Sequence, residues 1–252
     1  KGEIKFYRHH LCHVASAYYP SGFKNSLLLS LDGVGEIDTG IFALGSSGDI
    51  KIVHDKNRNP HSFGLLYSAI TSYLGWQHHC DEGIVMGLAP YGDPYQKVPK
   101  QHKTYYEIFC DILLEIGDFD YQVNQEWMAY YEVRDKWVSD RFTSVFGPKR
   151  EPEGEITSHH RSIAAALQLR LETVVLKQLR SARNTFKTNK LCVSGGVGLN
   201  CSMNGKIVAS GLFDEVFVQP ASGDDGTTIG ACFLAHKNLT GNLQPIKNHN
   251  SF

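Results

Sequence analysis

The sequence lacks the cysteine pattern of a zinc ribbon or of a small disulfide-stapled domain. None of its six cysteines forms a C-x-x-C pair. Such scaffolds use closely spaced cysteine pairs, so neither is expected here. Free thiols buried in a protein of the reducing cytoplasm are the ordinary interpretation of scattered cysteines.

Long apolar runs and an excess of one charge are also absent. No stretch reaches the roughly 18 apolar residues of a membrane span, and no signal peptide is visible. Lys and Arg number 25 against 26 Asp and Glu, a net charge of −1, so long-range attraction for a polyanion is missing. We expect a cytoplasmic protein that uses neither a membrane nor a nucleic acid as its partner. A homodimer stays open.

The first half of the sequence predicts a sheet followed by helices. Residues 26–32 form an apolar run typical of a buried strand. Residues 39–44 and 50–54 suit two more strands joined by a glycine-serine turn, which predicts an antiparallel meander. Apolar residues recur at helical spacing over 62–74, and Gly75 stands where a helix should end.

The second half predicts helices and strands separated by ligand-type loops. After a helix-rich middle at 104–146, residues 158–184 show the clearest helical spacing. Strands are expected at 191–193 and 215–219, each leading through a loop into a helix, the last at 227–236. Open α/β sheets bind ligands at the carboxyl ends of their strands, and this order therefore favours an α/β protein with ligand loops there.

The first candidate site is the histidine pair His9 and His13. Residues four apart share one helix face, so both rings can reach one metal ion. A third ligand, usually a carboxylate, must then come from elsewhere in the chain. Hydrogen-bonded structural histidines are the alternative, because this spacing alone does not define a metal site.

Two acids beside glycines are further candidates. Asp32 ends a strand and is followed by Gly33 and Gly35, which suits a phosphate or a metal-bound phosphate, although a plain hairpin turn has the same pattern. Asp224 and Asp225 precede a helix, where acids either ligate a metal or cap the helix.

The glycine-rich run at 194–200 lies between a strand and a helix. Backbone N–H groups and a helix N-terminus together suit a nucleotide phosphate. The run lacks the G-K-[ST] of a Walker loop and a secure G-x-G-x-x-G pattern. A tight structural turn is the alternative.

Taken in order, these motifs resemble the acceptor domain of the nodulation-factor and antibiotic O-carbamoyltransferases. That domain is related to the tRNA threonylcarbamoyl-transfer proteins and to the hydrogenase-maturation carbamoyltransferases. The resemblance covers nearly the whole chain and is weakest between about residues 95 and 155. The matching segments are 9–19, 31–36, 62–67, 85–92, 194–201 and 224–226.

The resemblance implies an actin-like, sugar-kinase-like (ASKHA) fold and a reaction. A carbamoyl group would pass from carbamoyladenylate, made from carbamoyl phosphate and ATP, to a hydroxyl of a small molecule or saccharide. An iron-like divalent metal is implied, although zinc also suits the ligand chemistry. The implied metal ligands are His9, His13, Asp32 and Asp224. The implied adenylate contacts are Gly33, Gly35, Ser194, Gly195, Gly196, Val197 and Asn200. Asp32 and His10 are the catalytic candidates, His10 as a base for the acceptor hydroxyl.

Two departures from the family pattern bear on activity. Ile84 stands where the family usually has a lysine. We also expect truncation at both ends, with the adenylate-forming domain absent. The chain then divides into a first part (1–94), a helical insertion (95–157), a second part (158–237) and a tail (238–252). A sugar-kinase-like phosphotransferase and a non-catalytic nucleotide-binding fragment are the alternative functions.

Overall fold

The computed structural model describes residues 4–246, and the chain divides into two compact units. Unit 1 combines the residues up to 59 with those from 179 onward, and unit 2 comprises residues 60–178. These boundaries differ from the sequence partition, since residues 60–94 belong to unit 2. Between residues 4 and 246, none of the helices has both the length and the apolar character that a membrane crossing requires.

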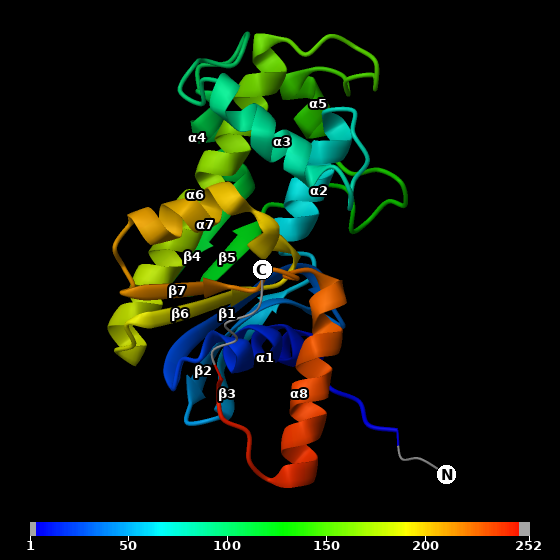
Figure 1. Ribbon diagram of the computed structural model, residues 1–252. Helices are drawn as coiled ribbons and strands as arrows, with labels where there is room; N and C mark the ends of the chain where they lie inside the picture. Colours follow the sequence, from blue (N-terminus) through cyan, green and yellow to red (C-terminus); the bar gives the residue numbers. More distant parts are fainter. Residues whose placement is uncertain (1–3, 247–252) are drawn as a thin grey trace. The chain divides into compact units, whose positions relative to one another are not determined.

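Unit 1 is built on a five-stranded mixed sheet with the order β3-β2-β1-β6-β7 (Figure 1). The antiparallel meander of β1, β2 and β3 confirms that prediction, and β6 and β7 run parallel to β1. The mixed α/β class is therefore confirmed. The strands are β1 (Asn25–Gly35), β2 (Asp38–Ser46), β3 (Asp49–Arg58), β6 (Lys190–Ser194) and β7 (Glu215–Val218).

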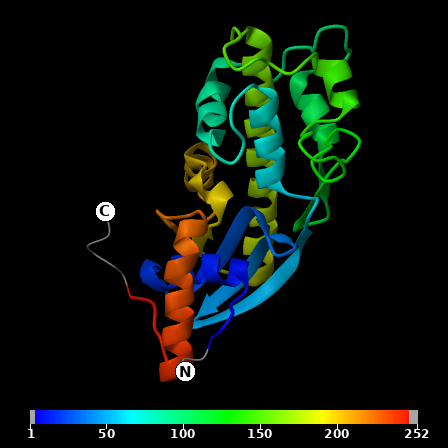
Figure 2. The same cartoon turned by 90° about the vertical axis from the view of Figure 1, so that its right-hand side faces the viewer.

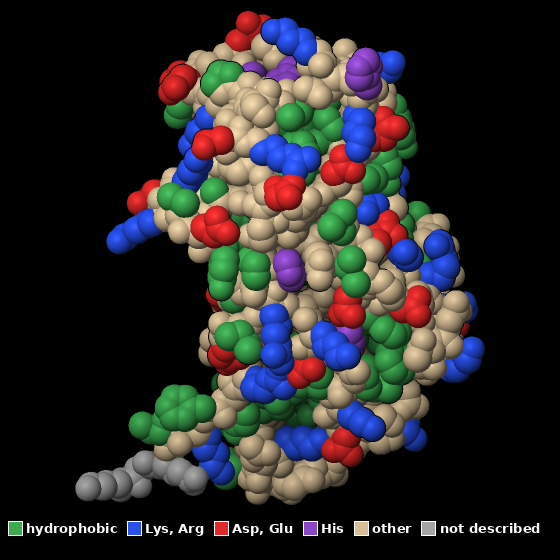
Figure 3. Space-filling model, turned by 180° about the vertical axis from the view of Figure 1, so that it is seen from behind, with side chains coloured by type: hydrophobic (Ala, Val, Ile, Leu, Met, Phe, Trp, Pro, Cys, Tyr) green, Lys and Arg blue, Asp and Glu red, His purple; other side chains and the backbone are tan. Residues whose placement is uncertain are grey.

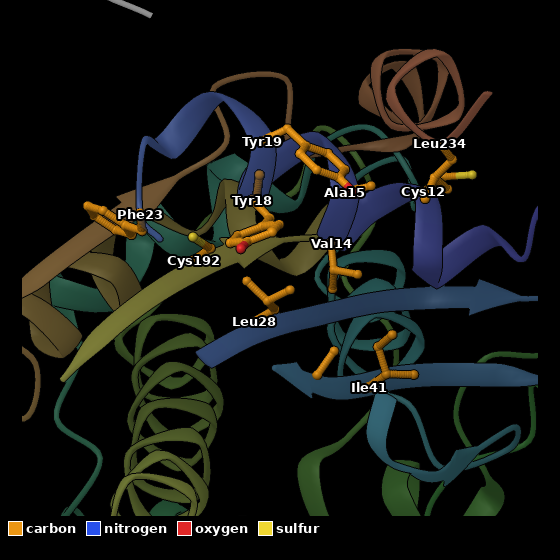
Figure 4. Close-up of a cluster of buried hydrophobic side chains, with 12 residues drawn as sticks. Cys12, Val14, Ala15, Tyr18, Tyr19, Phe23, Leu28, Ile41, Cys192 and Leu234 are labelled. Carbon is orange, nitrogen blue, oxygen red and sulfur yellow. The ribbon is translucent and has the colours of Figure 1, made fainter. Parts of the chain in front are cut away.

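Helix α1 (His9–Ser21) packs on this sheet, with α8 (Thr227–Thr240) beside it (Figures 1 and 2). Most of α1 is buried, as expected of a helix covered on two sides. Its Val14 and Tyr18 point toward Leu28, Ile41 and Cys192 of the sheet (Figure 4). This packing fixes where the start of α1 lies relative to the strand ends.

The rest of unit 1 lies before, between and after the strands β6 and β7. Its elements are the end of α6 (Ser158–Phe186), the short 3-10 turn η2 (Gly196–Leu199), α7 (Cys201–Ala209) and the 3-10 turn η3 (Asp224–Gly226). Asn200 caps α7 by accepting a hydrogen bond from the Met203 N–H at 2.9 Å. The strands, glycine turn and helices of this half therefore follow the predicted order.

Unit 2 is mostly helical and has an aromatic core. Its elements are α2 (Phe63–Tyr73), α3 (Glu82–Leu88), η1 (Ala89–Tyr91), α4 (Tyr105–Ile112), β4 (Leu113–Ile116), β5 (Asp120–Val123), α5 (Asp140–Phe146) and most of α6 (Ser158–Phe186). Gly75 has a φ of +87° just after α2, so the predicted helix end is confirmed. The helix-rich middle is interrupted by the β4–β5 hairpin, which the sequence interpretation missed.

Charged side chains of both signs lie among one another over the face shown in Figure 3. This mixture agrees with the near-zero net charge of the sequence. It gives the visible face no broad region of a single sign.

Candidate metal centre

The carboxyl ends of three parallel strands meet at one edge of the sheet in unit 1. Ser30 of β1 lies opposite Ser194 of β6, and Val193 of β6 lies opposite Val218 of β7. The residues after these positions are Asp32, the glycine run at 194–200 and the acidic loop that ends at Asp224. Parallel pairing thus places three of the predicted motifs at the edge where open α/β sheets bind ligands.

A bulge in β1 presents Asp32. Leu31 of β1 pairs with Gly40 of β2, and Gly35 of β1 pairs with Asp38 of β2. The register between the two strands is therefore irregular between Leu31 and Gly35. The bulged strand therefore uses more residues than its partner over this interval. Bulges re-aim side chains next to functional sites. Asp32 is only 8% exposed.

Four side chains converge at this edge, and we call them the metal-centre group. The Nε2 atoms of His9 and His13 are 2.9 Å apart. Asp32 Oδ2 lies 2.9 Å from His9 Nε2 and 3.4 Å from His13 Nε2. Asp224 Oδ1 lies 3.4 Å and 3.5 Å from the same two nitrogens. One ligand atom from each of the four residues lies within 4.8 Å of the other three.

The chemistry of this group fits a divalent first-row metal. Two imidazoles and two carboxylates form a borderline N/O donor set. Two bonds of about 2.1 Å at right angles, as in an octahedral site, place the nitrogens about 3 Å apart, close to the spacing of His9 and His13. One feature is unusual for a ligand: within the described part of the chain the buried Nδ1 of His13 has no hydrogen-bond partner, although ligating imidazoles commonly donate there.

Asp32 and His9 shift each other's pKa. Burial raises the pKa of Asp32, but hydrogen bonds from His13 and His9 outweigh it and hold that pKa well below its ordinary value. The hydrogen bond to Asp32 raises the pKa of His9, although burial opposes the rise. The Asp32 carboxylate thus favours positive charge beside it, either as a proton on His9 or as a bound cation.

His10 lies beside the group but points away from it. Its ring is 1% exposed, with Nδ1 2.8 Å from Ser30 Oγ and Nε2 3.0 Å from the carbonyl oxygen of Asp38. Burial lowers the pKa of His10. Both nitrogens thus bond α1 to the sheet, an arrangement that supports a structural role for His10 rather than that of a base.

The glycine run is hydrogen-bonded to a member of the metal-centre group. The Gly196 N–H donates to Asp32 Oδ1 at 2.9 Å. Gly195 has a φ of +87°, and a side chain there would overlap the backbone of β1, so glycine is required. The Ser194 hydroxyl is buried and donates to β1, while Asn200 caps α7. Contact of this run with an adenylate stays a prediction.

The other residues that the sequence singled out lie in unit 1, except Ile84, which lies in unit 2. Gly35 is buried, and a Cβ on it would overlap the ring of His9, whereas a Cβ on Gly33 would meet open space. Val197 belongs to the turn η2. Ile84 lies on α3 of unit 2 with 45% of its surface exposed.

Three residues at this site were missed from the sequence. Glu36 accepts a hydrogen bond from the His9 N–H at 3.1 Å, and the buried Ser222 hydroxyl donates to the Gly195 carbonyl at 3.0 Å. Gly230 lets α8 approach α1, because a Cβ there would overlap a carbonyl oxygen of α1. Glu36 is the last residue of the matching segment 31–36, but its partner is known only from the folded chain.

The chain belongs to the carbamoyltransferase family: the family model described as the carbamoyltransferase N-terminus matches residues 1–233. The resemblance inferred from the six motifs is therefore confirmed.

Curated relatives include two nodulation proteins. The chain is 35% identical to nodulation protein NolNO of Sinorhizobium fredii over 238 residues, which cover 94% of this chain and 32% of that protein. It is 36% identical to nodulation protein NolO of Bradyrhizobium diazoefficiens, over 92% of this chain and 38% of that protein. The chain thus spans less than two fifths of their length.

A solved structure also resembles this chain weakly. The crystal structure of HypF from T. kodakarensis aligns with a TM-score of 0.45 and 17% sequence identity. The alignment covers 93% of this chain and 37% of HypF.

Proposed function

We propose that unit 1 holds a divalent metal beside an activated carbamoyl donor and serves the transfer of the carbamoyl group to a hydroxyl. The observation that carries this proposal is the convergence of His9, His13, Asp32 and Asp224 next to the glycine run, in a chain of the carbamoyltransferase family. The proposed donor is carbamoyladenylate, formed from carbamoyl phosphate and ATP before it reaches this site.

In the proposed reaction the acceptor oxygen bonds to the carbamoyl carbon. The bond from that carbon to the phosphate oxygen breaks, AMP leaves with the electron pair, and the hydroxyl proton passes to solvent or to a base. A bound cation would polarise the carbamoyl carbonyl and offset charge on the departing phosphate. The four metal-centre residues would hold that cation, with iron favoured by the resemblance and zinc allowed by the ligands.

The glycine run has a separate proposed role. Backbone N–H groups between Gly195 and Asn200 would lie along the adenylate, with Gly33 leaving room for its approach. Preorganised donors stabilise developing charge without reorganising. The proposed fold is the actin-like, sugar-kinase-like one, with the helical insertion at 95–157. Ile84 replaces a cation that the family usually has, so we propose weaker donor binding than a lysine would give.

Metal content and nucleotide binding test the proposal together. The purified chain is loaded with Fe(II) or Zn(II), dialysed without nucleotide, analysed for metal and then titrated calorimetrically with AMP. We expect about one ion per chain and binding of AMP. Metal uptake without AMP binding would contradict the donor site. Absence of metal, together with ADP release from MgATP and a sugar, would favour a phosphotransferase.

A further inference from the structure

The start of α1 has no capping group of its own. Arg8, the N-cap residue, makes no side-chain capping bond, and the first turn of the helix contains no acid. His9 is the first helical residue, so its N–H is one of those that no helical carbonyl can reach. This N–H instead donates to Glu36 Oε1 at 3.1 Å.

Glu36 reaches His9 from the turn between β1 and β2. Its backbone lies in the left-handed region, with a φ of +55°, where glycine and asparagine are favoured over glutamate. The side chain is otherwise exposed. This turn places the Glu36 carboxylate within hydrogen-bond distance of the His9 N–H.

The same turn contacts the imidazole of His9. Gly35 packs so closely that a Cβ there would overlap the ring. Glu36 of the turn therefore bonds the backbone N–H of His9, and Gly35 at the end of β1 packs against its ring. Asp32, a second member of the metal-centre group, precedes Gly35 by three residues.

We infer that Glu36 is a positioning residue for the metal site: it caps α1 from the neighbouring turn and fixes the orientation of His9 as a ligand. The inference rests on the proposed metal-binding function. The negative charge also favours the N-terminal end of the helix dipole. Glu36 acts through His9, and its effect should resemble that of other groups that orient a metal ligand.

The test uses Co(II), whose visible spectrum reports ligand geometry. Glu36→Asn suits the left-handed turn, which offsets part of the lost cap, but is too short to reach His9. The metal-free protein should therefore stay folded, while Co(II) affinity falls about tenfold or more and the spectrum shifts. Glu36→Gln keeps an acceptor oxygen and should lose less. Glu153→Gln, at an exposed glutamate of unit 2, is the matched control and should match the wild type.

The outcomes separate the two proposals. Wild-type protein that takes up no Co(II) would contradict the metal function itself. Wild-type protein that binds Co(II), with Glu36→Asn binding equally tightly and giving the same spectrum, would overturn the positioning role and leave the metal function standing. Melting temperatures of the metal-free variants show that each is folded.

Discussion

Two stretches of the chain combine adjacent histidines with nearby acids, and they have different structures. In unit 1, His9 and His13 meet one carboxylate from the bulge of β1 and one from the distant turn η3. In unit 2, residues 78–82 contain five successive residues of ligand type, His-His-Cys-Asp-Glu. Among the residues that the structure describes, only the stretch in unit 1 contributes to a group that could hold a metal ion.

The unit 2 stretch uses its side chains for other purposes. The His78 ring packs against Trp137 at a centroid distance of 4.3 Å, and burial lowers the pKa of His78. Glu82 accepts a hydrogen bond from the His79 N–H at 2.6 Å, and Asp81 accepts one from the Gln77 N–H at 2.9 Å. Several ligand-type residues in a row therefore do not form a metal site, because a metal site needs ligand atoms that point toward one position.

Exchange of the two histidine pairs for alanine should give the largest difference. His9→Ala with His13→Ala removes both imidazoles, and we expect bound metal to fall from about one ion per chain to nearly none. His78→Ala with His79→Ala should retain the metal. Elemental analysis after dialysis measures both. Equal metal content in the two double variants would contradict the claim that only the unit 1 histidines bind the metal.

The two neighbouring acids of the unit 1 loop should also behave differently. Asp224→Asn replaces a carboxylate of the metal-centre group by a weaker amide ligand, and we expect metal affinity to fall by about 100-fold. Asp225→Asn should keep the metal and lose about 0.3–1 kcal/mol of stability from the helix dipole. Competition with a chelator and thermal unfolding check this pair. Metal loss confined to Asp225→Asn would place the ligand one residue later.

Metal affinity should rise with pH, because His9 must lose its proton to bind. The pKa of His9 lies above its ordinary 6.5, so below that raised value we expect affinity to gain about tenfold per pH unit from this proton. The His78→Ala and His79→Ala protein should show the same profile. A flat profile from pH 5.5 to 8 would show that no proton is displaced.

The metal-free protein should show the opposite dependence on the basic side. A raised pKa of His9 means that its pairing with Asp32 stabilises the fold fully below pH 6.5, and this contribution is lost as the pH rises through the raised value. The pKa of Asp32 is lowered, so its carboxylate contributes fully to stability above the ordinary pKa of an aspartate. This contribution is lost as the pH falls toward the lowered value. Urea unfolding at several pH values measures both limits.

A smaller effect is expected from the contact between α1 and α8. Gly230→Ala would overlap a carbonyl oxygen of α1, so we expect a loss of about 1–3 kcal/mol and some weakening of metal binding as Asp224 shifts. Gly205→Ala on α7 meets open space and should stabilise by up to about 1 kcal/mol. Denaturant unfolding compares the two. A stable Gly230→Ala protein would show that the helices can separate without cost.

The sequence predicted elements better than contacts. The meander, α2, α6 and the strand-loop-helix order after residue 190 were predictable because their apolar periods are long and their ends carry glycine or capping residues. The β4–β5 hairpin was missed because its strands have four residues each, too few to show a period. His9 and His13 could be paired from helical spacing alone, whereas the roles of Glu36 and Ser222 depend on which loops meet in space.

The carboxylate of Asp32 serves two neighbours at once. Its Oδ2 faces the two histidines, and its Oδ1 accepts the Gly196 N–H. Under the proposed function, a nucleotide that draws this N–H away leaves more negative charge for the ion, and an ion that withdraws charge loosens the glycine run. Such coupling is reciprocal: nucleotide and metal change each other's affinity by the same factor. Loading of the donor and retention of the ion are then one linked equilibrium.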